Sequence, residues 1–290
     1  MSEAFTERDD PEAVFALLSD ETRIDILREL RAAGETAYSD LRQQVGLRDS
    51  GQFNYHLDRL TGQFVTKTDA GYALTQAGKE IVGALASGNY TMDGTLAPVT
   101  LDDPCRRCGG TQTFQYADGL VHVDCEDCTA SATSGVPPAV LAGRDAAAMP
   151  RAANRYLRQT IRHATEGLCW YCNGTVETKI APVDDLDAVD ARDDALWATY
   201  ACQRCTASGT AGLDVALLAH PAVAGFYYDH GIDVRDRLIW AFPATDAVDV
   251  SVASRDPPTA TVSYTEGDET LTLAVDNTLA VTGVERDLSA

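Results

Sequence analysis

All eight cysteines of the chain lie in four Cys-x-x-Cys pairs, and their spacing predicts metal binding. The pairs are Cys105/Cys108, Cys125/Cys128, Cys169/Cys172 and Cys202/Cys205. Two such pairs that face each other place four thiolates around one zinc ion, at about 2.3 Å from the metal. The intervening segments, 109–124 and 173–201, have the length of a short strand pair. We therefore predict two zinc ribbons, each holding one structural Zn²⁺ ion.

An internal repeat supports two copies of one unit. The sequence Cys-Thr-Ala-Ser occurs at 128–131 and again at 205–208, and Cys-Gly-Gly-Thr at 108–111 parallels Cys-Asn-Gly-Thr at 172–175. In each copy a stretch of alternating residues precedes the third cysteine. The extra residues of the second copy fall around the acidic run 184–194, which we interpret as a surface loop. Repeated local sequence of this kind indicates a repeated structural module.

Other roles for the cysteines explain the pattern less well. Disulfides need an oxidising compartment, and the polar, acidic N-terminal segment has no apolar secretory signal. A redox Cys-x-x-Cys is expected at a strand-to-helix turn, whereas ribbon spacing is found here four times. Iron in a rubredoxin-like site matches the number of ligands equally well. We interpret His122, close to Cys125, as a strand residue and not a ligand.

Residues 38–74 contain the elements that would contact DNA. We expect a helix at 38–45 that ends at Gly46, then Asp49 as the N-cap of a second helix. Phe53, Leu57 and Leu60 form one apolar stripe on this second helix. Alternating residues on both sides of Asp69-Ala70-Gly71 predict a hairpin. Two helices and a hairpin in this order predict a winged helix-turn-helix, whose second helix enters the major groove.

Two motifs in this part of the chain resemble a known family. The sequence Ala-Leu-Leu-Ser-Asp-Glu-Thr-Arg-Ile-Asp-Ile-Leu at 16–27 resembles the opening helices of ArsR-type winged-helix transcriptional regulators. Asn-Tyr-His-Leu-Asp-Arg-Leu at 54–60 resembles their recognition helix, and the likeness covers roughly residues 11–88. It implies a DNA-binding regulator that forms a homodimer through its first and last helices. Metal sensing through cysteines of the helix-turn-helix, known in that family, is absent because no cysteine precedes Cys105.

The face of the second helix opposite its apolar stripe carries the predicted base contacts. Arginine pairs with guanine, and glutamine or asparagine with adenine, each worth about 1–3 kcal/mol of discrimination. His56 adjoins the apolar stripe, so we expect it to be packed and not in contact with a base. The predicted DNA-binding residues are Ser50, Gln52, Asn54, Tyr55 and Arg59 on the helix and Lys67 on the hairpin.

The charge of the chain is unusual for a protein that binds nucleic acid. It has 44 acidic and 23 basic residues, a formal net charge of −21, and only three lysines. This composition resembles proteins of extremely halophilic archaea, where a Debye length of about 3 Å at 1 M salt screens repulsion from phosphate. Residues 38–74 carry four acidic and four basic residues, so the predicted DNA-binding segment lacks the acidic excess.

The remaining segments contain no recognisable chemistry. Residues 88–103 resemble a linker or a loose strand pair, and 146–166 predict a helix with Arg151, Arg155, Arg158 and Arg162 on one face. Those arginines form either a second phosphate surface or, as we favour, a solvated face paired with acidic residues. Residues 213–219 and 221–230 predict helices, and 246–287 predict a four-stranded antiparallel meander.

The sequence therefore predicts an α+β protein in four parts. These are an ArsR-like winged helix-turn-helix at 1–95, a first zinc ribbon at 96–145, a helix with a second zinc ribbon and following helices at 146–243, and the meander at 244–290. The chain has no catalytic motif and no apolar run of the ~20 residues that a membrane span needs. We expect a cytoplasmic protein that is not an enzyme and does not contact membranes.

Two functional hypotheses follow from these features. The leading one is a dimeric, sequence-specific transcriptional regulator that binds double-stranded DNA and is stiffened by structural zinc. The alternative is a part of the transcription machinery, because a winged helix followed by a zinc ribbon also resembles archaeal transcription factor E, which contacts RNA polymerase. Two ribbons instead of one, and the additional C-terminal sheet, depart from that second pattern.

Overall fold

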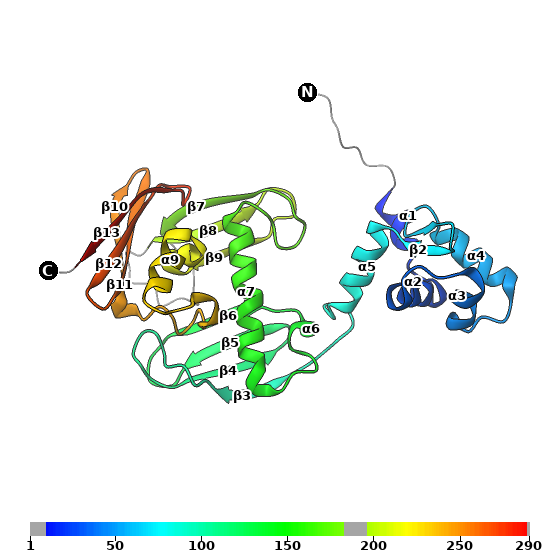
Figure 1. The fold of residues 1–290 in the computed structure, drawn as a ribbon, viewed down its shortest axis with the longest axis horizontal. Helices are drawn as coiled ribbons and strands as arrows, with labels where there is room; N and C mark the ends of the chain where they lie inside the picture. Colours follow the sequence, from blue (N-terminus) through cyan, green and yellow to red (C-terminus); the bar gives the residue numbers. More distant parts are fainter. Residues whose placement is uncertain (1–9, 183–195, 289–290) are drawn as a thin grey trace, which may run out of the picture. The chain divides into compact units, whose positions relative to one another are not determined.

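The computed structural model of the chain describes residues 10–182 and 196–288, and it is a mixture of helices and antiparallel sheets (Figure 1). It divides into two compact units, Met1–Met92 and Asp93–Ala290. The second unit contains the three segments that the sequence analysis separates into two ribbon modules and a meander. The predicted acidic loop at 184–194 lies outside the described residues.

The first unit contains five helices and one hairpin among its described residues. In order they are α1 (Pro11–Ala16), α2 (Glu21–Ala33), α3 (Tyr38–Val45), α4 (Ser50–Leu60), β1 (Val65–Lys67), β2 (Tyr72–Leu74) and α5 (Gln76–Ala86). The predicted positions of α3, α4 and the hairpin are confirmed. Helix α1 ends at Ala16, and residues 17–20 form the turn that leads into α2.

Side-chain caps set the starts of three of these helices. Asp20 accepts a hydrogen bond from the backbone of Arg23, Asp49 accepts from Gly51 and Gln52, and Thr75 accepts from Gly78. Each cap satisfies a backbone N–H that the first turn of a helix leaves without a partner. Gly46 ends α3 in the left-handed conformation, with φ at 76°.

A single apolar core holds the first unit together. Its buried side chains come from α2, α3, α4, the hairpin and α5, and include Ile26, Leu27, Leu41, Phe53 and Leu57. The hairpin is fixed to this core because Thr36, just before α3, exchanges two backbone hydrogen bonds of 2.9 Å with Tyr72. The helices and the hairpin are thereby held in one rigid arrangement.

The second unit begins with a four-stranded antiparallel sheet in the order β3–β4–β5–β6. Its strands are β3 (Leu96–Thr100), β4 (Gln112–Ala117), β5 (Leu120–Cys125) and β6 (Ser131–Gly135). We expected a linker or loose strands at 88–103, whereas Leu96–Thr100 is an edge strand paired with β4. Val99 and Leu96 of this strand pack against the core of the sheet, which explains why it is ordered.

Helix α7 (Met149–Thr165) is shared by two cores (Figure 1). It follows α6 (Pro138–Leu141) and a short turn of 3₁₀-helix, η1 (Ala146–Ala148). Ala153 and Leu157 in its first half are buried with Phe114 of the first sheet, whereas Ala164 near its end is buried with Ala198 of the next sheet. One helix therefore packs against both halves of the second unit.

The second half of this unit combines a second small sheet, short helices and the C-terminal meander in one core. The sheet has the order β7 (Val176–Pro182), β8 (Leu196–Cys202) and β9 (Ser208–Gly212). The helical segment that follows contains α8 (Leu213–Ala216), η2 (Leu217–Ala219), α9 (Pro221–Asp229), η3 (Val234–Asp236) and η4 (Thr245–Ala247). No described helix is long and apolar enough to cross a membrane.

The predicted antiparallel meander is confirmed. Its strands are β10 (Val248–Arg255), β11 (Pro258–Glu266), β12 (Glu269–Val275) and β13 (Val281–Leu288), paired in chain order. Val262, Tyr264 and Leu273 point inward and are fully buried, as their alternation with polar residues predicts. The meander therefore covers the helices α8 and α9 and has a structural role in this unit.

Asn154 of α7 gives the first prediction. Its buried side chain donates to the carbonyl of Arg237 and accepts from the N–H of Ile239, both at 3.0 Å. We expect Asn154→Ala to lower the free energy of unfolding by about 3 kcal/mol, because two backbone groups lose their partner. Urea unfolding in molar KCl measures this loss. Gln159→Ala on the exposed face of the same helix is the control, and an equal loss in both variants would contradict the prediction.

Candidate metal centres and nucleic-acid interface

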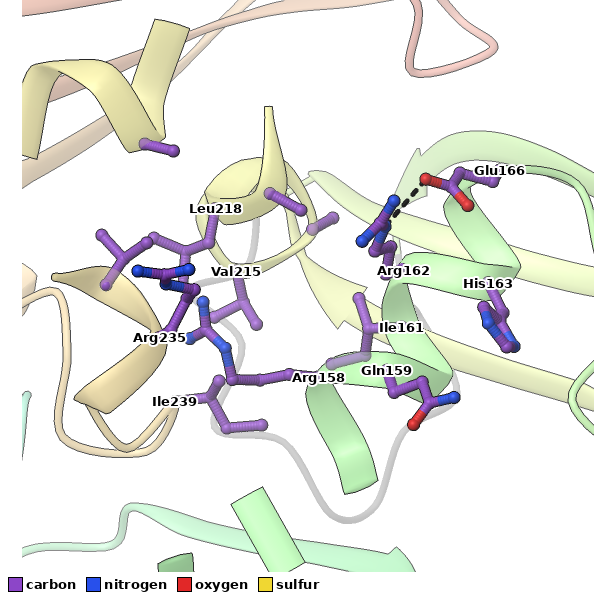
Figure 2. Close-up of a pocket in the computed structure, with 14 residues that line it drawn as sticks. Arg158, Gln159, Ile161, Arg162, His163, Glu166, Val215, Leu218, Arg235 and Ile239 are labelled. Atoms are coloured by element: carbon purple, nitrogen blue, oxygen red, sulfur yellow. Dashed lines mark hydrogen bonds and ion pairs between the residues drawn. The ribbon is translucent and has the colours of Figure 1, made fainter. Parts of the chain in front are cut away.

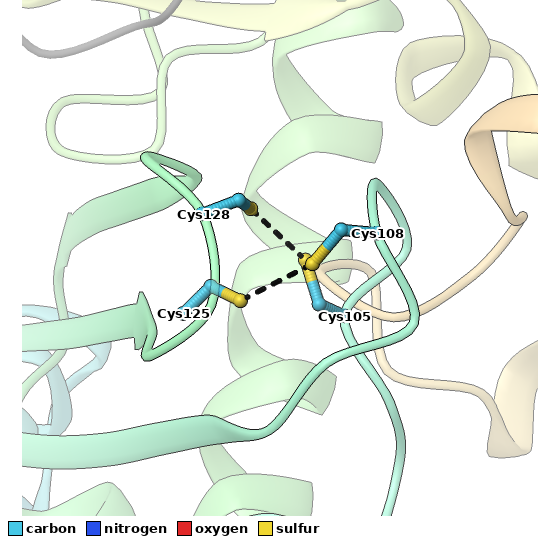
Figure 3. Close-up of side chains that lie close together, drawn as sticks. All are labelled: Cys105, Cys108, Cys125 and Cys128. Atoms are coloured by element: carbon cyan, nitrogen blue, oxygen red, sulfur yellow. Dashed lines mark hydrogen bonds between the residues drawn. The ribbon is translucent and has the colours of Figure 1, made fainter.

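The first four-cysteine cluster forms where two turns of the first sheet meet (Figure 3). Cys105 and Cys108 lie in the turn before β4, and Cys125 and Cys128 lie at the end of β5 and in the turn to β6. The sulfur atoms of Cys105 and Cys128 are 3.9 Å apart, and those of Cys108 and Cys125 are 3.6 Å apart. Four sulfur atoms from two turns thus converge on one point.

The second four-cysteine cluster has the same construction in the second sheet. Cys169 and Cys172 precede β7, and Cys202 and Cys205 flank the turn between β8 and β9. The sulfur atoms of Cys169 and Cys205, and those of Cys172 and Cys202, are each 3.6 Å apart. In each cluster all four sulfur atoms lie within 4.8 Å of one another.

Backbone hydrogen bonds show that the two clusters are copies of one unit. The N–H of Cys105 donates to Gly110 at 2.8 Å, as that of Cys169 does to Gly174 at 2.9 Å. The same correspondence relates the bonds from Cys125 to Ala130 and from Cys202 to Ala207. The structure therefore contains the internal repeat that the sequence indicates, down to individual turns.

These distances suit a tetrahedral metal ion. A regular tetrahedron with metal–sulfur bonds of about 2.3 Å has edges of about 3.8 Å, which the measured separations of 3.6–3.9 Å match. A disulfide needs sulfur atoms at about 2.05 Å, and all eight cysteines are free. Both clusters are therefore positioned to bind metal ions. Four thiolates complete the coordination shell, so neither site leaves a position for a substrate.

Backbone N–H groups surround the sulfur atoms and offset their negative charge. Gly110 donates to Cys108 and Asp127 to Cys125, both at 3.4 Å, and Gly174 donates to Cys172 at the same distance. The N–H groups of Cys205 and Arg204 lower the pKa of the Cys202 thiol to about 6. Such hydrogen bonds favour thiolates, which are the form that binds metal.

In the same cluster the pKa of the Cys205 thiol is raised and not lowered. The N–H of Ala207 acts to lower its pKa, but the thiol of Cys172, burial and the thiols of Cys169 and Cys202 together raise that pKa to about 12. Four sulfur atoms so close together cannot all be negative without a cation between them. Binding of a metal dication therefore releases protons from the cluster, and metal affinity increases with pH.

His122 lies outside both clusters, as the sequence analysis expects. Its Nδ1 atom is 3.1 Å from the hydroxyl of Thr133 on the adjacent strand.

Arg106, which lies between Cys105 and Cys108, makes long-range contacts that the sequence did not indicate. Its guanidinium pairs with the buried Asp214 of α8, and its carbonyl accepts from the N–H of Thr245 at 2.7 Å. Because 108 residues separate Arg106 from Asp214, no local pattern could predict this pair.

The predicted DNA-binding residues are all exposed on the first unit. Phe53, Leu57 and Leu60 of α4 are buried, so the opposite face of the helix is exposed. His56 is half-buried, with its Nδ1 atom 3.4 Å from the Asp20 carboxylate, as expected for a packed residue. The exposed residues of the predicted set are Ser50, Gln52, Asn54, Tyr55 and Arg59 on α4 and Lys67 on β1.

The structure thus brings the predicted DNA-binding residues onto one helix and one hairpin. Tyr55 is 61% exposed, and one edge of its surroundings is the ring of His56, at a centroid distance of 5.2 Å. Asp58 is exposed on the same helix and introduces one negative charge beside Arg59. A surface of this kind can hydrogen-bond to base edges but has few charges for phosphate.

Comparison with known families matches both units. A family model described as a domain of unknown function (DUF7351) matches residues 102–281, which is more than half of the chain. A second, also described as a domain of unknown function (DUF7347), matches residues 11–85. No curated protein and no solved structure matches the chain. The first matched segment contains both four-cysteine clusters, and the second contains α4 and the hairpin.

The cluster geometry predicts a metal content of two ions per chain. We expect Cys202→Ser to reduce this to one, because a serine hydroxyl replaces a thiolate in the second cluster while the first stays intact. Elemental analysis of protein purified without chelator measures the content. Ser208→Ala, in the adjacent strand, is the control and should retain both ions. A metal content near zero in the unsubstituted protein would contradict the assignment of both clusters.

Proposed function

The chain belongs to the family of the domain of unknown function DUF7351, and from its geometry we propose that it is a DNA-binding transcriptional regulator. In this proposal the first unit is a winged helix-turn-helix of the ArsR type. Helix α4 enters the major groove, and the β1–β2 hairpin lies beside it against the phosphate backbone. The second unit is an accessory module stiffened by two structural zinc ions.

The observation that carries the proposal is the separation of two faces on α4. Three apolar side chains of this helix are fully buried, while Gln52, Tyr55 and Arg59 on the opposite face are exposed. Polar side chains are usual on the outer face of an amphipathic helix, and here three of them are spaced i, i+3 and i+7, so they form one stripe. Arginine and glutamine at these positions can bond to two atoms of guanine and adenine, respectively.

The charge around this helix supports the same function. The segment 38–74 has equal numbers of acidic and basic residues within a chain of net charge −21. A duplex that approaches this segment therefore meets less repulsion than the net charge of the whole chain implies. Molar salt shortens the range of the remaining repulsion to about 3 Å.

Zinc is the metal that we propose for both four-cysteine clusters. Four cysteine thiolates at tetrahedral spacing, with Cys-x-x-Cys turns, are typical of structural zinc sites. The metal joins the two cysteine turns of each sheet and adds to the contacts of the shared cores. In this proposal zinc contributes to folding and takes no part in a reaction.

A homodimer is part of the proposal, and α1 with α5 is the surface that we assign to it. No residue of α1 is buried, although four of its six residues are alanine, valine or phenylalanine, and Phe15 is 66% exposed. On α5, Ile81 and Leu85 are half-buried. Exposed apolar side chains on the outer helices of a small unit indicate a protein interface.

Arg59 gives the first test of DNA recognition. Duplexes selected from a random pool in molar KCl should share a preferred sequence, and footprinting should protect it. We expect Arg59→Ala to reduce discrimination against the best alternative base by about 1–3 kcal/mol, because one bidentate contact is lost. Competition binding with matched duplexes measures this.

The matched control is Arg28→Ala, which removes the same charge from an exposed position of α2. It should leave the preferred sequence unchanged. Identical preferences in the Arg59 variant and the unsubstituted protein would remove this residue from the interface. Association with RNA polymerase, without a protected duplex, would instead indicate that the first unit binds protein.

The dimer surface gives a separate prediction. We expect Phe15→Glu to convert the protein to a monomer, because the change places a charge in an apolar interface. Light scattering coupled to size-exclusion chromatography measures the mass. Val284→Glu, at a 47% exposed position of β13, is the control and should leave the mass unchanged. A monomeric unsubstituted protein would refute the dimer without affecting the cluster assignment.

A further inference from the structure

A cavity of about 520 Å³ lies within the second unit, and no cysteine is among its lining residues (Figure 2). Its walls come from the second half of α7, the α8–η2 segment and η3. The volume is within the range of about 300–1,000 Å³ that small-molecule sites occupy. Neither the proposed DNA contact nor the metal clusters use this space.

Arg158 provides the inner polar group of this cavity. Its side chain extends from α7 toward Arg235, as Figure 2 shows. The Nη1 atom is buried and has no hydrogen-bond partner among the described residues. Burial lowers the pKa of Arg158, and only the charge of Asp233 acts against this effect. A buried guanidinium nitrogen without a partner is costly, and an anionic ligand would supply the missing acceptor.

The charges around Arg158 are positive overall, which is unexpected in so acidic a chain. Arg162 and Arg235 also line the cavity, and Glu166 is its only lining carboxylate among the described residues. Arg162 pairs with Glu166 at 2.8 Å and Arg235 with Asp233 at 2.6 Å, and the two arginine side chains are 63% and 82% exposed. These two pairs neutralise two arginines, so the charge of Arg158 is left for a ligand with a single negative charge.

The rest of the wall is aliphatic. Ile161 of α7 and Leu218 of η2 line the cavity, and Val215, Val234 and Ile239 complete this part of the lining. A phosphate ion in this cavity would have one buried hydrogen-bond donor and a mostly apolar wall around it. An aliphatic chain would instead be stabilised by about 25 cal/mol for each Å² of apolar surface that it buries. We propose that the cavity binds a small amphipathic monocarboxylate, whose carboxylate bonds to Arg158 and whose aliphatic body lies against Ile161, Val215 and Leu218.

The proposal is independent of DNA binding, and it is tested on the full chain by calorimetric titration in molar KCl. Hexanoate is the probe, hexanamide is its neutral counterpart of equal shape, and inorganic phosphate is the anion without an apolar body. We expect hexanoate to bind at least about tenfold more tightly than hexanamide, because a charged hydrogen bond is lost with the amide. Phosphate should not compete with hexanoate. High salt suppresses non-specific attraction to surface arginines.

Two variants locate the site. Arg158→Met should weaken hexanoate binding at least about tenfold, and Val215→Phe should do the same by filling the cavity. Arg155→Met, which removes an exposed arginine from the same helix, is the control and should bind normally. Without ligand, Arg158→Met should unfold at the same or a higher temperature, since the substitution removes a half-buried guanidinium whose buried Nη1 atom has no hydrogen-bond partner. A purely structural arginine would give a lower temperature.

Any of the following results would contradict the proposal. Absence of hexanoate binding, or equal binding of hexanoate and hexanamide, removes the carboxylate site, and this comparison needs no variant. Equal binding to the Arg158 variant and the unsubstituted protein would show that the anion binds elsewhere. Phosphate that displaces hexanoate at equal concentration would mean that the cavity selects charge alone. Because no DNA is present in these titrations, their failure is distinguishable from failure of the DNA-binding proposal.

Discussion

The convergence of four sulfur atoms at each four-cysteine cluster is the constraint on which the second unit depends. Thiolates at 3.6–3.9 Å repel one another, and backbone N–H groups offset only part of that charge. A bound dication turns this repulsion into attraction and fixes the two turns of each sheet to each other. The first cluster has a further consequence, because Arg106 in its turn pairs with the buried Asp214 of α8. The position of the first turn is thereby coupled to the core that contains the meander.

Helix α7 explains why the repeat does not produce two separate ribbon domains. Its first half is buried with the first sheet and its end with the second sheet, so a single helix closes two cores. Asn154 bonds this helix to residues 237 and 239, which lie beside the core of the first sheet. Along α7, Arg158 follows the side chains that are buried in the first core and precedes those that are buried in the second. Its side chain therefore belongs to neither core and lines the cavity instead.

The sequence could predict features that depend on local spacing. The four Cys-x-x-Cys turns, the caps at Asp49 and Thr75, and the alternation in the meander all have short-range causes. The strand at 96–100 has only a weak signal because its edge position and its proline interrupt the alternating pattern, and pairing with β4 orders it. The Arg106–Asp214 pair and the aliphatic wall of the cavity join residues that are far apart in the chain. Such contacts follow from packing, for which single-sequence periodicity has no signal.

The surroundings of the four arginines of α7 could not be predicted from their spacing either. Their spacing predicts one face, but the structure gives them different environments: Arg151 donates to the carbonyl of Asp236, Arg162 pairs within its own helix, and Arg158 turns into the cavity. In molar salt, charge acts over about 3 Å, so a strongly acidic protein gains little from long-range attraction. Recognition of an anion then depends on contact: a forked hydrogen bond, a desolvated guanidinium or a buried apolar surface. As proposed, the exposed row on α4 and the half-buried Arg158 would both supply contacts of this short-range kind, and the net charge of −21 would not oppose either of them at such distances.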